Sequence, residues 1–417
     1  MSILALIGIL VTVAALFGWV SARVLRVPQT LGSMGLTVTA SLLLIVFSNF
    51  VPRLHGLALN MVGQIDLGAL ILHGMLGLLL FAGAFLLDLP ALRAEWFPVS
   101  MLSIFATPLS MAGVAGLIFF AAPFAGVHAN FIECLLFGAL IAPTDPIAVL
   151  EMLGRSGVGK QIEAQLAGES LFNDGIGAVL FLTLLGISQG ARQTFLQVAL
   201  RLQLEAGGAL LLGIALAFLA SALMRRVDRY QVEILLALSL ALGGYALAEA
   251  LHLSAPLEAV AAGLALRQFN LRHAEHSIAH EDLGQFWTLT DEVQNAILFV
   301  LLGLEVLAIS FNRSTLLIGA AAVLAVVAVR ALSVGSVIAV VRLFQPKLKT
   351  SLLALTWGGL RGGLSIALAL SIPHAQGRDW ILPATYIVVV FSVLAQGGTL
   401  SPALEWQRRL TRSKTTA

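Results

Sequence analysis

Ionisable side chains occur deep inside stretches of this 417-residue sequence that are otherwise apolar. Six of them lie well away from the ends of such stretches: Asp145, Glu169, Asp174, Glu305, Arg330 and Arg361. A charge at the centre of a lipid bilayer costs from about 3 to more than 10 kcal/mol, so such groups usually pair with one another or line an ion pathway. The carboxylates among them are hard oxygen ligands, suited to hard cations.

The first group of these residues is bracketed by prolines. Pro143 and Pro146 flank Thr144 and Asp145, and each proline removes a backbone donor, so carbonyls one turn upstream lose their helical partners. Free carbonyls, a hydroxyl and a carboxylate together are typical ligands of a hard cation. The simpler interpretation is a proline kink in which Asp145 caps the second half-helix, and capping would not exclude contact with an ion.

A second polar group follows in the segment 168–174. On a helix, Ser170 and Asp174 share one stripe, and Glu169 and Asn173 share the adjacent one. An N-terminal cap would not extend a full turn deeper to Asn173 and Asp174. The alternative is a polar patch that serves packing alone.

Arg330 is the natural partner for one of these acids. A carboxylate beside a guanidinium stays ionised, so pairing of Arg330 with Glu169 would leave Asp174 free to titrate near neutral pH. A group that holds either a proton or a cation, and never both, is the minimal device for exchange. The hypothesis is therefore a Glu169–Arg330 pair that leaves Asp174 as the exchanging carboxylate.

The composition identifies the elements that must position these residues. Hydrophobic residues make up 59% of the chain and charged residues 11%, with a mean hydropathy of +0.96. An average soluble domain carries about 25% charge. These values exclude a soluble enzyme, a disordered tail and a nucleic-acid binder that uses a basic patch, and the single cysteine excludes a disulfide framework. The chain is predicted to be an all-α polytopic membrane protein.

A membrane-spanning helix needs about 20 predominantly apolar residues, and by this criterion the sequence contains thirteen predicted spans. They lie near 2–22, 31–50, 67–87, 97–121, 131–153, 164–187, 204–224, 231–250, 255–267, 290–310, 315–341, 351–372 and 380–402. With the N-terminus outside, 17 of the 24 Lys and Arg residues fall on the inner side and five on the outer. Because cytoplasmic loops collect Lys and Arg, this asymmetry predicts an outside N-terminus and a cytoplasmic C-terminus.

Thirteen spans permit two inverted six-helix repeats within one transporter domain, 1–417. The first repeat would be 1–186, the linking helix 204–224, the second repeat 231–402 and the cytoplasmic tail 403–417. The fifth and twelfth spans, at corresponding positions, carry the helix breakers Pro143/Pro146 and Gly358-Gly359-Leu360-Arg361-Gly362-Gly363. Paired broken helices are typical of secondary transporters with inverted repeats. We expect the two discontinuous helices to cross.

Four stretches in order along the chain carry a family resemblance: 138–149 (GALIAPTDPIAV), 168–174 (GESLFND), 330–333 (RALS) and 357–362 (WGGLRG). With them the sequence resembles the NhaP-type sodium/proton antiporters, monovalent cation:proton antiporters related to the eukaryotic sodium/hydrogen exchangers. The resemblance implies a secondary transporter, not an enzyme, that exchanges Na⁺ or Li⁺ for H⁺ and needs no cofactor beyond the transported ions.

The resemblance also implies roles for individual residues. Na⁺ would be held by the Thr144 carbonyl, the Ser170 hydroxyl and the carboxylates of Asp145 and Asp174. Asp174 would be the main ion and proton carrier. The supporting residues would be Asn173 at the unwound crossing, Glu169 paired with Arg330, and Arg361 at the half-helix ends.

The resemblance further implies a homodimer in the bacterial inner membrane, serving pH homeostasis. Its core domain would move like an elevator against a dimerisation domain. An Asn173-Asp174 pair, instead of two aspartates, resembles the electroneutral branch that exchanges one Na⁺ for one H⁺.

Three alternatives remain beside sodium/proton exchange. A K⁺/H⁺ antiporter of the same fold would use the same ligands, and a cation channel would use similar oxygens. An intramembrane aspartic protease could use Asp145 and Asp174 as a dyad. The sequence around neither aspartate resembles such a protease, however, and the broken helices favour alternating access.

Overall fold

The computed structural model describes residues 3–25, 29–47, 56, 67–145, 149–150, 159–190, 195–227, 229–271, 279–346 and 348–415. Within these ranges the regular structure is helical apart from one isolated β-bridge. The helices of the first half are α1 (Ile3–Val20), α2 (Gln29–Val46), α4 (Leu67–Ala69), α5 (Leu76–Leu86), α6 (Leu89–Ala94), α7 (Trp96–Met101), α8 (Thr107–Ala121), α9 (Phe131–Ile141) and α11 (Lys160–Ser188).

The second half of the chain is also helical. Its helices are α12 (Phe195–Met224), α13 (Tyr230–Ala250), α14 (Ala255–Leu271), α15 (Ala279–Glu305), α16 (Arg313–Phe344), α17 (Leu352–Trp357), α18 (Gly363–Leu370), α19 (Arg378–Phe391) and α20 (Gly398–Thr415). Short π or 3₁₀ turns join several of them: η1 (Ser21–Leu25), η2 (Leu70–Met75), η3 (Leu102–Ala106), η4 (Ala122–Ala125), η5 (Val306–Ala308), η6 (His374–Gln376) and η7 (Ser392–Gly397).

Every predicted span contains a helix in the structure. Among the described residues, seven helices are long and apolar enough to cross a membrane, judged by length and composition alone. The total of thirteen crossings stays a prediction. One boundary differs clearly: α15 begins at Ala279, well before the predicted start of the tenth span at 290, because its first turns are too polar for an apolar window to detect.

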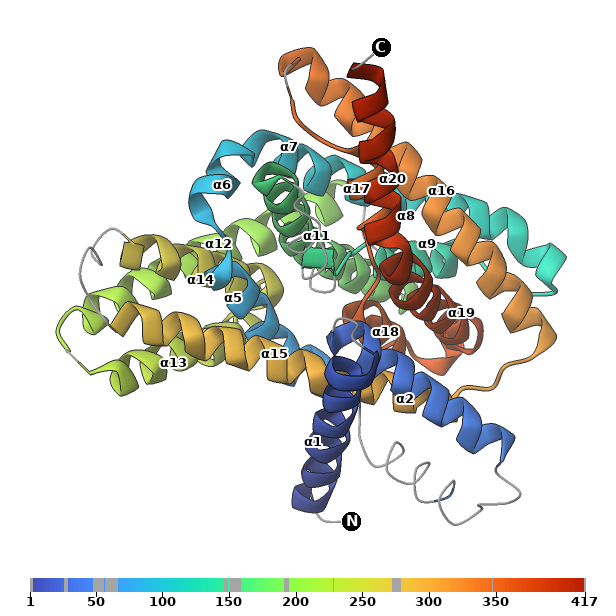
Figure 1. The fold of residues 1–417 in the computed structure, drawn as a ribbon, viewed down its shortest axis with the longest axis horizontal. Coiled ribbons are helices and arrows are strands. Elements are labelled where there is room, and N and C mark those ends of the chain that lie inside the picture. Colours follow the sequence, from blue (N-terminus) through green and yellow to red (C-terminus); the bar gives the residue numbers. More distant parts are fainter. Residues whose placement is uncertain are drawn as a thin grey trace.

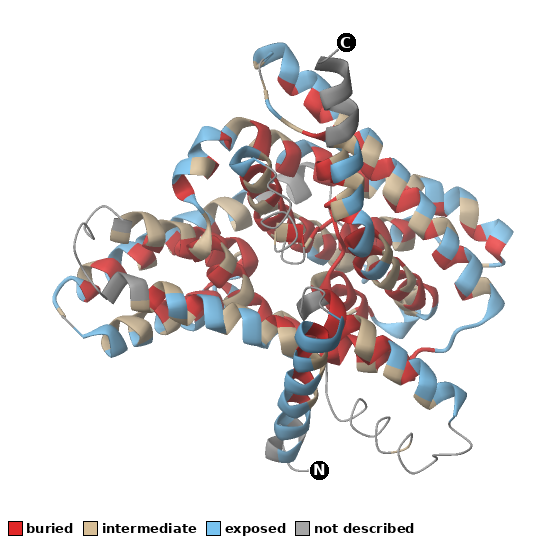
Figure 2. Cartoon of the chain, in the orientation of Figure 1, coloured by how far each residue is buried: buried red, intermediate tan, exposed pale blue. Residues whose placement is uncertain are grey.

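Large apolar side chains cover much of the outer surface. Leu211, Leu324 and Leu332 are each more than 70% exposed, and buried residues concentrate on the faces where helices meet (Figure 2). Extended apolar surfaces of this kind are unfavourable in water and favourable against lipid. The exposure pattern therefore agrees with a membrane-embedded chain.

The helices form two groups (Figure 1). In the first group α5, α12, α13 and α14 pack on one another, and α15 packs on α1, α2, α5 and α13. In the second group α8 packs on α9 and α16, α9 packs on α11 and α18, and α19 packs on α16 and α18. Figure 1 shows α12–α14 on one side of the molecule and α8, α9, α16 and α19 on the other.

Close helix approach in the first group depends on small residues. A Cβ atom added at Gly263 of α14 would lie 2.6 Å from the carbonyl oxygen of Phe81 and 2.8 Å from the Ala84 side chain, both on α5. Without side-chain bulk the two backbones meet directly, as is common where helices associate in membranes.

The predicted crossing of two discontinuous helices is confirmed. Helix α9 ends at Ile141 and α17 ends at Trp357, and the chain then runs extended until α18 begins at Gly363. The two extended segments meet in an antiparallel bridge between Asp145 and Leu360, where the Asp145 amide donates to the Leu360 carbonyl at 2.7 Å. Pro146 lies outside the described residues, so its predicted part in this break is not described.

Candidate functional site

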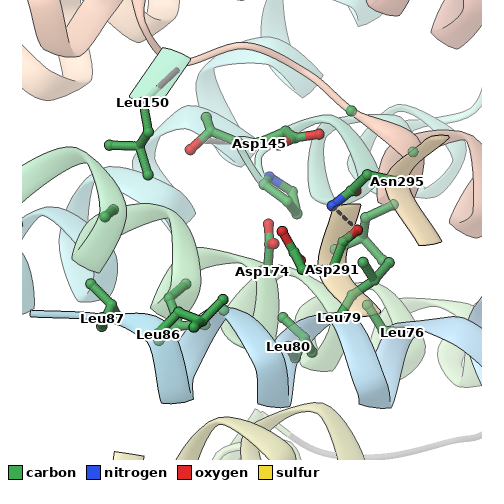
Figure 3. Close-up of a pocket in the computed structure, with 18 of the residues that line it drawn as sticks. Leu76, Leu79, Leu80, Leu86, Leu87, Asp145, Leu150, Asp174, Asp291 and Asn295 are labelled. Carbon is green, nitrogen blue, oxygen red and sulfur yellow. Dashed lines mark hydrogen bonds between the residues drawn. The ribbon is translucent and has the colours of Figure 1, made fainter. Parts of the chain in front are cut away.

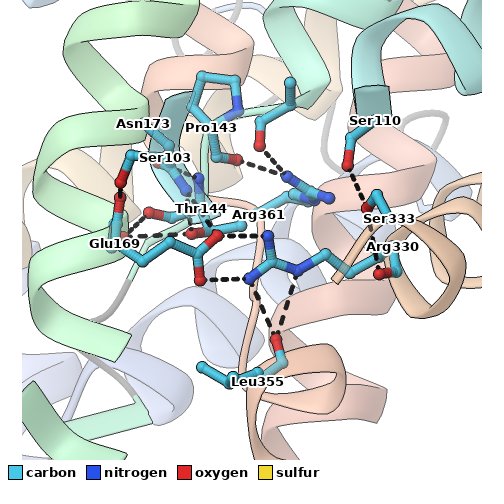
Figure 4. Close-up of polar contacts among 12 residues, drawn as sticks. Ser103, Ser110, Pro143, Thr144, Glu169, Asn173, Arg330, Ser333, Leu355 and Arg361 are labelled. Atoms are coloured by element: carbon cyan, nitrogen blue, oxygen red, sulfur yellow. Dashed lines mark hydrogen bonds and ion pairs between the residues drawn. The ribbon is translucent and has the colours of Figure 1, made fainter. Parts of the chain in front are cut away.

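Arg361 lies at the centre of the crossing and satisfies the end of α9. Its guanidinium Nη1 donates to the carbonyl oxygens of Ala142 at 2.5 Å and Pro143 at 2.8 Å, and the residue is only 1% exposed (Figure 4). These carbonyls follow the last turn of α9, where helical donors run out and the helix dipole places negative charge. Arg361 therefore lies at the end of the α9 half-helix and satisfies two of its carbonyl oxygens.

Asn173 ties the extended segment to helix α11. Its Oδ1 accepts from the Thr144 amide at 3.1 Å, and its Nδ2 donates to Thr144 Oγ1 at 2.8 Å. Ser170, on the same helix, donates its hydroxyl to the Thr144 carbonyl oxygen. All three residues are buried. Asn173 thus replaces helical hydrogen bonds that Thr144 lacks.

The predicted ion pair between Glu169 and Arg330 is present. Nη1 of Arg330 lies 2.5 Å from Glu169 Oε1, and Nη2 lies 2.7 Å from Oε2, which is the two-pronged geometry that guanidinium and carboxylate favour (Figure 4). Arg330 also donates to the Leu355 carbonyl at 3.1 and 3.3 Å. The side chains of Arg330 and Glu169 are 3% and 0% exposed, so each charge depends on the other.

A cavity of about 450 Å³ lies beside the crossing, between the two helix groups. Its walls include leucines of α5, together with Pro143 and the polar residues Thr144, Asp145 and Asp174 of the crossing region (Figure 3). Exposed Asp88 and Lys160 also line it, so the cavity opens at the end of the molecule where α11 begins. The predicted carriers Asp145 and Asp174 thus share one accessible space.

Three other predicted site residues do not line the cavity. Glu169, Ser170 and Asn173 belong to the buried hydrogen-bond network, and the described cavity lining does not include them. Thr144 joins the two, because it lines the cavity and is held by both Ser170 and Asn173.

Two lining residues were missed by the sequence analysis. Asp291 and Asn295 stand one turn apart on α15 and line the same cavity. The tenth span was predicted to start at 290, next to Asp291, and the sequence analysis assigned Asp291 no role. The signal that could have found them is the spacing of four between two polar residues, which places them on one helix face.

Oxygen ligands for a single hard cation are available here, from carboxylate, hydroxyl and carbonyl groups. Within the described part of the chain there is no cluster of three or more His, Cys, Asp or Glu side chains arranged to hold a metal ion.

Comparison with known proteins places this architecture in a family. The family described as "Sodium/hydrogen exchanger, transmembrane" matches residues 10–406 of the chain. This chain belongs to the sodium/hydrogen exchanger family. The match extends over nearly all of the sequence, so it includes the crossing, the ion pair and the cavity.

The chain is also similar to individual antiporters and to a solved structure. It is 40% identical to the Na(+)/H(+) antiporter NhaP of Pseudomonas aeruginosa over 407 residues, which is 96% of each chain. It is 32% identical to the Na(+)/H(+) antiporter ApNhaP of Aphanothece halophytica, over 81% of this chain and 64% of that protein. The solved structure of the sodium proton antiporter MjNhaP1 from Methanocaldococcus jannaschii has the same fold, with a TM-score of 0.73 and 21% identity over 96% of this chain and 98% of that one.

Gly362 allows the two extended segments of the crossing to approach each other closely. A Cβ atom added at Gly362 would lie 2.6 Å from Cβ of Asp145 and would also contact its carboxylate. We expect Gly362→Ala to push Asp145 aside and to reduce the transport rate at least about tenfold, with a loss of about 1–3 kcal/mol of stability from overpacking.

Ion-flux rates and thermal unfolding in detergent measure the two effects. Gly335→Ala on α16 is the matched control, because a Cβ atom there meets only ordinary contacts at 3.8 and 4.0 Å. Equal rates for Gly362→Ala and Gly335→Ala would show that the approach of Gly362 to Asp145 does not matter for transport.

Proposed function

We propose that this protein exchanges Na⁺ or Li⁺ for H⁺ across a membrane by alternating access, with one cation exchanged for one proton. The observation that carries the proposal is a cavity that presents Asp145 and Asp174 together, while the buried guanidinium of Arg330 is already neutralised by Glu169. The names of the similar proteins from Pseudomonas aeruginosa and Aphanothece halophytica agree with sodium/proton exchange.

The ion ligands in this proposal are the Thr144 carbonyl, the Ser170 hydroxyl and the carboxylates of Asp145 and Asp174. The Thr144 carbonyl oxygen has two lone pairs, so it can accept from Ser170 and still face a cation. Asp174 carries either the cation or the proton. Because protonation removes the negative charge that attracts Na⁺, the two ions compete for one carboxylate, and that competition couples their movement.

The charge balance around the crossing supports an exchange of one cation for one proton. Within the second helix group, two carboxylates, Asp145 and Asp174, and one buried guanidinium, Arg361, remain once the Glu169–Arg330 pair is set aside. The remaining charge of −1 is neutralised equally by one Na⁺ or one H⁺. The loaded site has the same charge in both forms, which is what an electroneutral exchange cycle needs.

The moving unit in this proposal is the second helix group, which holds the crossing. It would slide against the first helix group as an elevator, in a homodimer in the bacterial inner membrane. The N-terminus would lie outside and the C-terminus in the cytoplasm. The division of the chain into inverted repeats 1–186 and 231–402, joined by 204–224 and followed by the tail 403–417, belongs to the same proposal.

Proton movement in everted vesicles from a host without its own antiporters tests the function. A pH-sensitive dye reports the gradient while NaCl, LiCl, KCl or choline chloride is added. We expect Na⁺ and Li⁺ to dissipate the gradient and choline to have no effect. A response to K⁺ alone would change the substrate to potassium, and dissipation with every salt would indicate a channel. No response, with the protein present in the membrane, would overturn exchange.

A further inference from the structure

A third carboxylate reaches the ion cavity from the opposite helix group. Asp291 of α15 lines the same cavity as Asp145 and Asp174, and the close-up shows all three side chains around one space (Figure 3). Asp145 and Asp174 belong to the second helix group, whereas α15 packs mainly on α1, α2, α5 and α13 of the first.

The surroundings of Asp291 are built for a polar occupant. Asn295, which is 2% exposed, donates its amide to the Asp291 carbonyl oxygen at 2.8 Å and lines the cavity one turn away. Ser365 of α18 also lines the cavity; it is 1% exposed, and its hydroxyl has no hydrogen-bond partner among the described residues. A buried hydroxyl without a partner costs free energy unless a ligand or water satisfies it. Ser365 therefore places a further polar group on the wall of the cavity that Asp291 lines.

We propose that Asp291 is a side-specific affinity residue: it strengthens binding of the monovalent cation on the face to which this cavity opens, and not on the opposite face. The inference rests on the proposed sodium/proton exchange and on the movement of one helix group against the other. It concerns a residue outside the ligand set Thr144, Asp145, Ser170 and Asp174.

The effect is specific to one face because Asp291 belongs to the first helix group, which does not move with the crossing in the proposed cycle. The leucines of α5 form one wall of the cavity, and apolar walls concentrate the field of a charge between them. A cation at Asp174 therefore feels the additional negative charge of Asp291 while the site faces this cavity. When the crossing moves with its helices, Asp291 does not follow. The site then loses that attraction, so it releases the cation more readily on the other face.

The same charge also attracts protons, so Asp291 does not alter which ions compete. The other charged residues along the cavity are Asp88, Lys160 and Glu163, toward its mouth. The contribution of Asp291 thus acts on affinity from one side, while the carrier chemistry stays at Asp174.

The test compares Na⁺ dependence on the two faces of the full-length protein. Everted and right-side-out vesicles are prepared from the same cells, and the apparent KM for NaCl is measured in each. For Asp291→Asn we expect the KM to rise about three- to tenfold on the cavity side, to change less than about twofold on the other, and Vmax to be retained. Added choline chloride should shrink the difference, because salt screens the charge.

Three further variants keep the experiment decisive. Glu292→Gln removes an exposed charge from the next position of α15 and should leave both KM values unchanged. Asp291→Ser, which also lacks the charge, should reproduce the shift if Asp291→Asn does not reach the membrane, and Asp291→Glu should largely restore affinity. The inference would be overturned if the KM rose equally on both faces, or if the neutral Asp291 variants had the same KM as Glu292→Gln. Either result would leave the exchange activity of the wild type unaffected. Absence of exchange in the wild type would instead overturn the proposed function, and this inference with it.

Discussion

Asp174→Asn is expected to reduce cation/proton exchange at least about a hundredfold while leaving the protein folded. Asparagine keeps the shape of the side chain but neither binds a proton near neutral pH nor carries the charge that holds a cation. Asp174 shares its cavity with Asp145, so two like charges occupy one space when both carboxyls are ionised. Removing one of them should leave the free energy of unfolding unchanged or raise it by about 1 kcal/mol. Loss of transport together with equal or higher stability would separate the carrier role from a structural one.

Dye-reported exchange in vesicles and thermal unfolding in detergent provide the two measurements. Asp379→Asn, at the start of α19, removes an aspartate whose side chain is 85% exposed, and should leave both values near those of the wild type. Residual exchange above about a tenth of the wild-type rate in Asp174→Asn would contradict the assignment of Asp174 as carrier. Asp145 would then be the next carboxylate to test.

Glu169→Gln should be the most destabilising single substitution of a charged residue at the crossing. It leaves the Arg330 guanidinium in a site that is 3% exposed, facing a neutral amide. Breaking a buried pair by removing one partner typically costs about 3–5 kcal/mol, because the remaining charge stays desolvated. The carbonyl of Leu355 would be the main remaining partner of Arg330 among the described residues. We expect a markedly lower unfolding temperature and little protein in the membrane.

A double-mutant cycle isolates the pair energy. Glu169→Gln with Arg330→Gln removes both charges, so it should be more stable than the sum of the single losses by about 2–3 kcal/mol. The exposed pair His374–Asp379 is the control, and there the corresponding coupling should stay below about 1 kcal/mol. Additive losses for Glu169 and Arg330 would show that the buried contact does not couple them. A charge-swapped double variant that folds no better than either single variant would lead to the same conclusion.

The break in two helices was predictable because its causes are local. Pro143 cannot donate a backbone hydrogen bond, and the glycines from Gly358 to Gly363 weaken helical order, so each interruption is encoded within a few residues. The sequence alone did not show that Asp145 and Leu360 would pair their backbones. That contact joins segments more than 200 residues apart, and it depends on how both helices pack.

The cavity was less predictable than the crossing. Hydropathy located the apolar part of α15 but missed its polar first turns, and with them the position of Asp291 inside a helix. Whether a polar residue near a predicted span end faces water, lipid or a cavity depends on the neighbouring helices. For Asp291 the deciding neighbours are α5 and the crossing, which no property of the local sequence describes.

The sequence by itself determined that the chain forms apolar helices suited to a membrane and that two of these helices are broken. It also showed that acids and arginines occur inside apolar stretches, where a charge is costly unless it is paired. These are properties of residue type and short-range spacing. The pairing of Glu169 with Arg330 was expected from the sequence and is present in the structure. Only the tertiary structure showed that Arg361 satisfies the carbonyls at the end of α9 and that Asp145, Asp174 and Asp291 line one cavity. The physical reason is that burial and charge pairing are set by distant segments brought together in packing, whereas helix formation and helix breaking are set within a turn or two of the chain.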